Sequence, residues 1–124
     1  MSHKKCARDF GVVLFVMGLL GFIPLLTIDG YFLGVFKVNL YTNTLHLATG
    51  LIAYLLSHSS LRACKISFQI FGLIYGFVAV MGFGYGDEEI LGYIANNMPD
   101  SWLHLIICLL TFYLGFLYKS TRKR

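Results

Sequence analysis

Two stretches of 25 residues carry the same pattern and decide the fold. Residues 32–56 read FLGVFKVNLYTNTLHLATGLIAYLL, and residues 90–114 read ILGYIANNMPDSWLHLIICLLTFYL. At a constant shift of 58 they share eight identical positions, among them the histidines His46 and His104. Upstream the shift becomes 61, and the dipeptides Phe-Gly and Gly-Phe each recur there. The chain therefore reads as one two-helix unit written twice.

The composition is typical of a membrane protein. Hydrophobic residues make up 57% of the 124 residues and charged residues 13%, against about 45–50% and about 25% in soluble domains. Four apolar segments follow one another, and three of them come close to the roughly 20 residues that cross a bilayer. The second segment is short, and its polar flanks, residues 42–44 and 57–60, must complete the span. We predict that all four cross; they cover residues 10–28, 45–56, 66–85 and 102–118.

The distribution of charge indicates the orientation. Nine of the ten Lys and Arg residues lie at the termini or in the middle loop, whereas five of the six acids lie in the two long loops. Short cytoplasmic loops are rich in Lys and Arg, so both termini and the middle loop are predicted to be cytoplasmic. The basic run at residues 119–124 is predicted to anchor the chain at anionic headgroups. Because the basic residues sit at membrane borders, they argue against a nucleic-acid partner.

These observations predict an all-α fold and one domain, residues 1–124. The domain is an integral membrane four-helix bundle made of two tandem two-span repeats, at about residues 8–60 and 66–119. Because each repeat contains two spans, both repeats enter the membrane with the same orientation. The partners predicted from this fold are the lipid bilayer and either further copies of the chain or another membrane protein.

The two long loops are predicted to lie at the outer face of the membrane. Their apolar and aromatic stretches, residues 31–36 and 89–94, are expected to form short helices at the interface. Each ends near an asparagine, Asn39 or Asn97, that is predicted to form a turn or to stop the loop helix. Side chains that cap the next span are expected just after these turns. They are Thr42, Asn43 and Thr44 in the first half, and Asp100 and Ser101 in the second.

Small residues on the first and third segments are expected to pack helices together. In lipid, helices associate by close approach of their backbones, which glycine permits. The glycines concerned are Gly11, Gly18 and Gly21 on the first segment, and Gly72 and Gly76 on the third.

The recurring histidines His46 and His104 are the candidate functional residues. Each lies one turn inside the outer end of its span. The favoured prediction is that each imidazole bonds to a loop carbonyl and tethers the loop to the bundle. The alternatives are a transition metal or haem iron bound between the two rings, and a proton or another ligand. A separation of about 4 Å or less between ring nitrogens would suit a shared metal ion.

The sequence contains none of the common catalytic motifs. It lacks a nucleophile elbow, a phosphate loop and a dinucleotide fingerprint, so no catalytic residue is predicted. Apart from the metal or haem alternative, no cofactor is predicted either. The expected function is that of a non-enzymatic membrane component, structural or partner-binding. The other alternative is a small transporter or channel, which would have to act as an oligomer because four spans leave little room for a substrate cavity.

The order of these motifs resembles a known bacterial family, domain of unknown function 4383. Its pattern is Phe-Gly and Gly-Phe in a span, Leu-Gly then Val-Asn in the loop, and Asn-x-x-His-x-x-x-Gly opening the next span. The resemblance implies a small four-span protein of the bacterial inner membrane and implies no activity. The second half departs from the pattern at Ser101 and Cys108. The matching residues are Phe10, Gly11, Gly21, Phe22, Leu33, Gly34, Val38, Asn39, Asn43, His46 and Gly50, then Leu91, Gly92, Asp100, Leu103 and His104.

Overall fold

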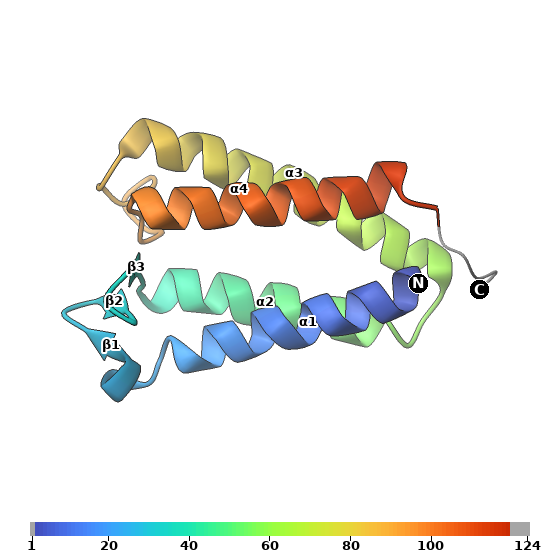
Figure 1. Cartoon of the computed structure of the whole chain (residues 1–124), viewed down its shortest axis with the longest axis horizontal. Helices are drawn as coiled ribbons and strands as arrows, with labels where there is room; N and C mark the ends of the chain where they lie inside the picture. The colour runs from blue at the N-terminus through green and yellow to red at the C-terminus, as the bar shows by residue number, and fades with distance from the viewer. Residues whose placement is uncertain (1, 120–124) are drawn as a thin grey trace.

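Four helices make up most of the chain and lie along one long axis. The computed structural model describes residues 2–119, so most of the expected basic anchor at residues 119–124 lies outside the described part (Figure 1). The helices are α1 His3–Leu20, α2 Leu40–Leu56, α3 Leu61–Tyr85 and α4 Met98–Phe112, which the π-helical turn η2 Tyr113–Leu117 continues. Helix α1 packs against α2, and α3 against α4, and the two pairs lie side by side (Figure 1).

Two asparagines begin the helices that follow the long loops. The Oδ1 atoms of Asn39 and Asn97 accept the backbone N–H groups of Thr42 and Asp100 at 2.9 and 3.0 Å. Both asparagines have extended backbones, as an N-cap residue requires. The prediction that they end loop helices is therefore wrong, and so is the expected capping by residues 42–44 and 100–101. Those residues lie inside the first turns of α2 and α4.

The first long loop contains a small sheet where a short helix was expected. After the 3-10 turn η1 Pro24–Leu26, the strands β1 Thr27–Ile28, β2 Tyr31–Phe32 and β3 Phe36–Lys37 pair antiparallel in the order β1-β2-β3. Leu33 and Gly34 adopt φ values of 54° and 72° between β2 and β3. A right-handed helix cannot pass through such left-handed residues, so the chain turns back on itself.

The second long loop also lacks the expected helix. Ile90 and Ile94 form an isolated antiparallel bridge. Between them, Leu91 and Gly92 repeat the left-handed turn, with φ values of 54° and 79°. The shared Leu-Gly dipeptide thus marks a tight turn in both loops, because glycine takes positive φ without steric cost.

The helices differ in their fitness to cross a membrane. Among the described residues, two helical segments are both long and apolar enough to do so, Leu61–Tyr85 and Met98–Leu117. Helix α1 ends at Leu20, earlier than the predicted span end at residue 28. Helix α2 starts at Leu40, earlier than its apolar run.

Aromatic rings fill the space between the two helix pairs. The ring of Phe10 on α1 contacts those of Phe68 and Phe71 on α3, with centroids 5.7 and 6.1 Å apart. At the end opposite the strands, His3 Nε2 lies 2.8 Å from the carbonyl oxygen of Leu114. This contact joins the start of α1 to η2.

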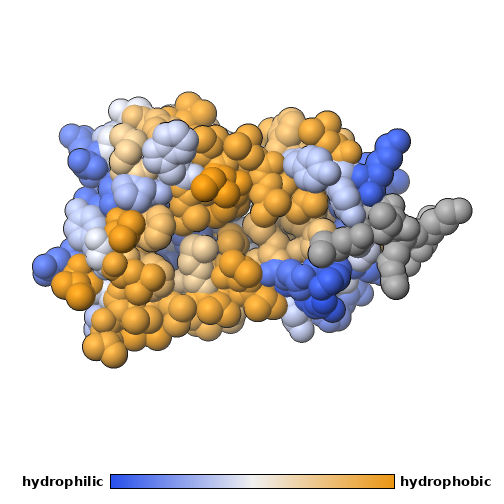
Figure 2. Space-filling model, in the orientation of Figure 1, coloured by the Kyte–Doolittle hydropathy of each residue, from blue (hydrophilic) through white to orange (hydrophobic). Residues whose placement is uncertain are grey.

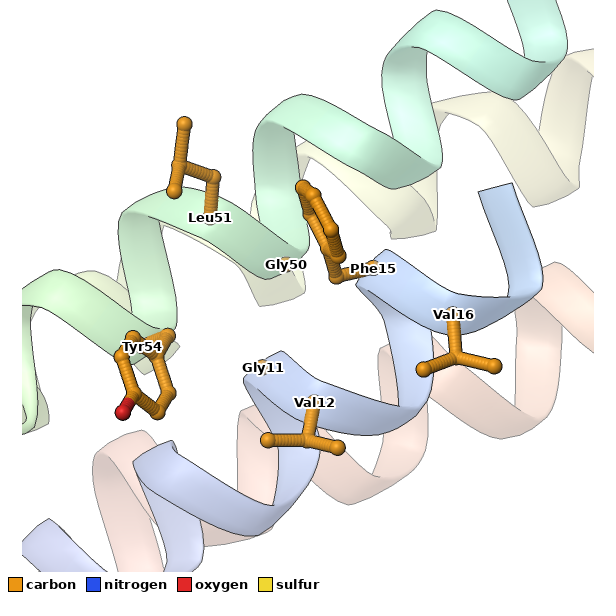
Figure 3. A pocket seen from close by; sticks show the side chains of 7 residues that line it. All are labelled: Gly11, Val12, Phe15, Val16, Gly50, Leu51 and Tyr54. Carbon is orange, nitrogen blue, oxygen red and sulfur yellow. The ribbon is translucent and has the colours of Figure 1, made fainter. Parts of the chain in front are cut away.

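Glycines set the close approach within each helix pair. A Cβ atom on Gly50 would lie 2.4 Å from the backbone nitrogen of Phe15, and one on Gly11 would lie 2.6 Å from that of Tyr54. In the other pair, a Cβ on Gly72 would lie 3.2 Å from the backbone nitrogen of Phe112. Figure 3 shows Gly11 and Gly50 facing each other across the α1–α2 crossing. An apolar groove of about 390 Å³ runs over this crossing.

Candidate functional site

The two long loops are fastened to each other by their asparagine caps. Asn39 Nδ2 donates to the carbonyl oxygen of Tyr93 at 2.7 Å, and Asn97 Nδ2 donates to that of Val35 at 2.9 Å. Each asparagine therefore caps its own helix through Oδ1 and holds the opposite loop through Nδ2. Lys37 adds a further link, because its Nζ atom donates to the carbonyl oxygen of Asp87 at 3.3 Å.

The recurring histidines meet next to these cross-loop hydrogen bonds, which we call the loop clamp. His46 on α2 and His104 on α4 bring their Nε2 atoms to 3.4 Å, with ring centroids 5.6 Å apart and planes at 53°. Their exposed fractions are 4% and 1%. The hydrogen bonds that hold the loops come from asparagines, whereas the two imidazoles face each other. The structure thus brings together the residues predicted as the candidate pair, in the arrangement that the metal alternative requires.

Tyr75 on α3 closes the inner side of the pair. Its buried ring lies parallel to that of His46 at 6.4 Å and tilted to that of His104 at 5.7 Å. The Tyr75 hydroxyl donates to Thr49 Oγ1 at 3.1 Å, and Thr49 Oγ1 donates to the carbonyl oxygen of Leu45 at 2.7 Å. The phenol is therefore satisfied without the histidines, and its ring acts as an apolar floor. Neither Tyr75 nor Thr49 was expected at the site, because neither recurs in the other half.

Two buried polar atoms beside the pair have no hydrogen-bond partner among residues 2–119. They are Asp100 Oδ2 and His104 Nδ1. The two residues lie four positions apart on α4, so their side chains share one face of the helix. Asp100, exposed by only 2%, also lines a small cavity of about 100 Å³ together with Asn43 and His46. Met17 and aromatic residues of the first loop form its apolar wall.

The other residues that were predicted to support the site are packed against glycines. Asn43 lies against Gly21 at the end of α1, so closely that a Cβ there would meet its side-chain amide. In the second half, Ser101 Oγ would lie 2.6 Å from a Cβ on Gly82. Gly18 faces the backbone of Leu47 in the same way, at 2.8 Å. Gly76, in contrast, would meet only the sulfur of Cys108, at 3.1 Å.

One polar residue of the second loop was missed altogether. Asn96 has an exposed fraction of 0%, and its Nδ2 atom donates to the carbonyl oxygens of Gly82 and Gly86, each at 2.9 Å. Its Oδ1 atom accepts the hydroxyl of Ser101 at 3.2 Å. Val38 stands at the equivalent position of the first half, so the repeat carried no sign of this residue.

Replacing Asn97 tests the clamp separately from the cap. Asn97→Ser keeps a side-chain oxygen for the cap and removes the donor to Val35, so it should destabilise the protein by about 1 kcal/mol. Asn97→Ala removes both contacts and should cost roughly 1 kcal/mol more. The measurement is the free energy of unfolding of purified protein in mild detergent. A serine variant as stable as the wild type would show that the cross-loop bond contributes nothing.

Among residues 2–119, no group of three or more His, Cys, Asp or Glu side chains is placed to hold a metal ion. The arrangement supplies two imidazole nitrogens, one nearby carboxyl group and a small cavity. It offers no nucleophile with an adjacent base.

Comparison with known proteins identifies a family. No curated protein and no solved structure shows significant similarity to the chain. A family model described as "Domain of unknown function (DUF4383)" matches residues 4–117, nearly the whole chain. The match includes all four helices and the histidine pair, and the chain belongs to the DUF4383 family.

Proposed function

We propose that the protein is a four-span integral protein of the bacterial inner membrane and acts there as a non-enzymatic structural or partner-binding component. The observation that carries this proposal is the apolar surface. Large apolar side chains are exposed along all four helices, for example Val13, Leu55, Leu73 and Ile106. In Figure 2 apolar residues dominate the middle of the visible face and polar residues gather toward the two ends. A soluble protein rarely exposes an apolar surface of this extent.

The lengths of α2, and of α1 together with the turn η1, are compatible with crossing the hydrocarbon core of a bilayer. At 1.5 Å per residue, the 17 residues of α2 are about 26 Å long, slightly less than the roughly 30 Å hydrocarbon core. In α1 the charged residues end at Asp9, so its apolar part is residues 10–20, about 17 Å long. The apolar turn η1 extends α1 on the outer side, and the aromatic residues of the loops suit the interface. In the first turn of α2 the side chains of Thr42 and Asn43 are buried, whereas Thr44 is exposed.

Contacts that recur at the sequence shifts support a tandem repeat. The bond from Asn39 to the Tyr93 carbonyl has its counterpart in the bond from Asn97 to the Val35 carbonyl. Positions that are equivalent in sequence thus make equivalent contacts across the two halves. The same holds within the halves for the contacts of Gly11 with Tyr54 and Gly72 with Phe112, and of Gly21 with Asn43 and Gly82 with Ser101.

The charge distribution supports cytoplasmic termini. Asp9, the single acid on the basic side, is paired with Lys5 Nζ at 3.1 Å, and this hydrogen bond lowers the pKa of its carboxyl group. The acids of the long loops lie with the strands, at the opposite end of the helices (Figure 1). This separation favours the positive-inside orientation.

Labelling of single added cysteines tests the topology. A membrane-impermeant maleimide applied to intact cells should label Glu88→Cys in the second long loop and should not label Ser59→Cys between α2 and α3. Both positions are exposed, so Ser59→Cys should react once the membrane is opened. The unmodified protein, with its three native cysteines, gives the background. The reverse pattern would overturn the orientation, and labelling of both variants in intact cells would overturn the spans.

A non-catalytic role agrees with the filled interior. Because Phe10, Phe68 and Phe71 occupy the space between the helix pairs, a transport path would have to lie between copies of the chain. The proposed partner-binding role places contacts on the helix surfaces or on the clamped loops. Crosslinking in membranes, followed by mass measurement, distinguishes a second copy from a different membrane protein. A strictly monomeric protein without crosslinks would leave only the structural role.

A further inference from the structure

We infer that His46 and His104 bind one transition metal ion, of the Zn²⁺ or copper class, and that Asp100 orients His104 through its second ring nitrogen. The inference goes beyond the proposed membrane role. It depends on the proposed topology in one respect, because that topology makes the outer side the source of the ion.

The distance between the two ring nitrogens suits two ligands of one metal ion. In tetrahedral coordination two imidazole nitrogens, each 2.0–2.1 Å from the metal, stand about 3.3–3.4 Å apart. The two Nε2 atoms are 3.4 Å apart, a spacing that also allows a long hydrogen bond between the two neutral imidazoles, one donating and one accepting. Two helices of different repeats thus hold the nitrogens at the spacing of two metal ligands. The same spacing leaves no room for a haem macrocycle between the rings.

The unpartnered atoms of α4, Asp100 Oδ2 and His104 Nδ1, suit a histidine that is oriented by a carboxylate. If the Nε2 atom of His104 ligates a metal, its proton must sit on Nδ1, and that N–H group needs an acceptor. Asp100 Oδ2, one helical turn earlier, is a buried acceptor without a partner, although the carboxyl group as a whole accepts the backbone N–H groups of Asn97 and Lys37. Carboxylates commonly hold metal-ligating histidines in this way, which fixes the tautomer and raises the basicity of the ligand. One assignment therefore accounts for both buried atoms, with a water bridging Asp100 Oδ2 and His104 Nδ1 while the carboxyl group keeps its backbone hydrogen bonds.

The small cavity beside His46 concerns the coordination positions that the protein leaves open. With two protein ligands the metal keeps open positions, as catalytic zinc sites do with three ligands. The cavity of about 100 Å³ has His46 in its wall, and at roughly 30 Å³ per molecule it can hold about three waters. Imidazole ligands suit zinc and copper, whereas Mg²⁺ and Ca²⁺ prefer oxygen. Of the two proposed ligands only His46 lines this cavity, so waters that complete the coordination would approach the metal from the His46 side.

Metal titration of purified full-length protein in mild detergent tests the inference. Co²⁺, which reports tetrahedral coordination by its visible absorption bands, should bind at one ion per chain, and Zn²⁺ should displace it. The double variant His46→Gln/His104→Gln should lose the bands. His58→Ala, which removes an exposed histidine near the α2–α3 turn, should leave them unchanged. No binding by folded wild-type protein would overturn the site, as would bands that persist in the double variant.

The role of Asp100 has its own variants. Asp100→Leu should weaken Co²⁺ binding by about 10–100-fold, whereas Asp100→Asn, which keeps an acceptor oxygen, should weaken it less. Equal affinities in all three proteins would remove Asp100 from the inference and leave the histidine pair standing.

A measurement on the wild type covers the case in which the glutamine variants do not fold. In Cu²⁺-loaded protein, electron spin-echo modulation from the remote ring nitrogens should count two imidazoles. A count of none or one would overturn the pair as ligands. Cysteine labelling performed on the same variants keeps the outcomes separate. A protein with the proposed topology and no metal contradicts this inference alone, whereas a metal-binding protein with another topology contradicts only the proposed membrane arrangement.

Discussion

Gly50→Ala is expected to separate α1 from α2 and to destabilise the protein by about 3 kcal/mol, at the upper end of the usual cost of overpacking. The new Cβ would stand 2.4 Å from the backbone nitrogen of Phe15 and 2.6 Å from the carbonyl oxygen of Gly11. Both are backbone atoms, so no side-chain rotation can relieve the contact. The helices would have to part by about 1 Å, the difference between 2.4 Å and ordinary contact at 3.4 Å. The measurement is the unfolding midpoint in mild detergent.

Gly84→Ala is the matched control for this change. Gly84 also lies within a helix, α3, but a Cβ there would meet nothing within 4 Å. Alanine is the better helix former by roughly 1 kcal/mol, so this variant should be as stable as the wild type or slightly more so. If Gly50→Ala and Gly84→Ala unfold at the same midpoint, the α1–α2 crossing is not as close as the structure places it.

The second half shows why Gly50 need not recur in the sequence. Its equivalent is Cys108, and the equivalent of Phe15 is Gly76. In the first pair the larger residue, Phe15, lies on α1 and the glycine lies on α2. In the second pair the glycine lies on α3 and the larger residue, Cys108, lies on α4. In α3–α4 the Cys108 sulfur lies where a Cβ on Gly76 would come within 3.1 Å. The departure from the repeat at Cys108 is therefore a reciprocal exchange at one crossing.

The four helices and the equivalence of the two histidines could be predicted from long-range features of the sequence. Apolar length indicated three of the four helices, and the repeat indicated the second helix and related His46 to His104. Whether the imidazoles would face each other depended on the rotation of α2 and α4, which a single sequence does not specify. Position in the first turn of a span favours a loop tether by the histidines, but the side-chain donors to the loop carbonyls of Tyr93 and Val35 belong to Asn39 and Asn97.

The loops could not be predicted because their conformation depends on single dihedral angles. An apolar, aromatic stretch favours an interfacial helix by composition. The Leu-Gly pairs at Leu33 and Leu91 instead take positive φ at both residues, which costs a leucine roughly 1–2 kcal/mol. The cross-loop hydrogen bonds from the asparagine caps offset that cost, and these bonds join residues more than 50 positions apart. No local pattern reports them.

Asn96→Leu is expected to destabilise the protein by about 3 kcal/mol, because it removes three hydrogen bonds from a fully buried position at about 1 kcal/mol each. The Gly82 and Gly86 carbonyls lie at the end of α3, and the Gly82 carbonyl also accepts the backbone N–H of Gly86 at 3.0 Å. The Ser101 hydroxyl, on the first turn of α4, would also lose its acceptor. Asn96 thus joins the end of α3 to the start of α4, and the variant should loosen the loop that carries the Tyr93 carbonyl.

Ser101→Ala removes one of these three bonds and provides the graded control. It should cost about 1 kcal/mol, so the unfolding free energies should fall in the order wild type, Ser101→Ala, Asn96→Leu. Amide hydrogen exchange in the second long loop should rise in the same order, because local opening of the loop precedes global unfolding. A leucine variant that unfolds with the serine variant's midpoint would show that the two glycine carbonyls are satisfied by water, and that Asn96 does not join α3 to α4.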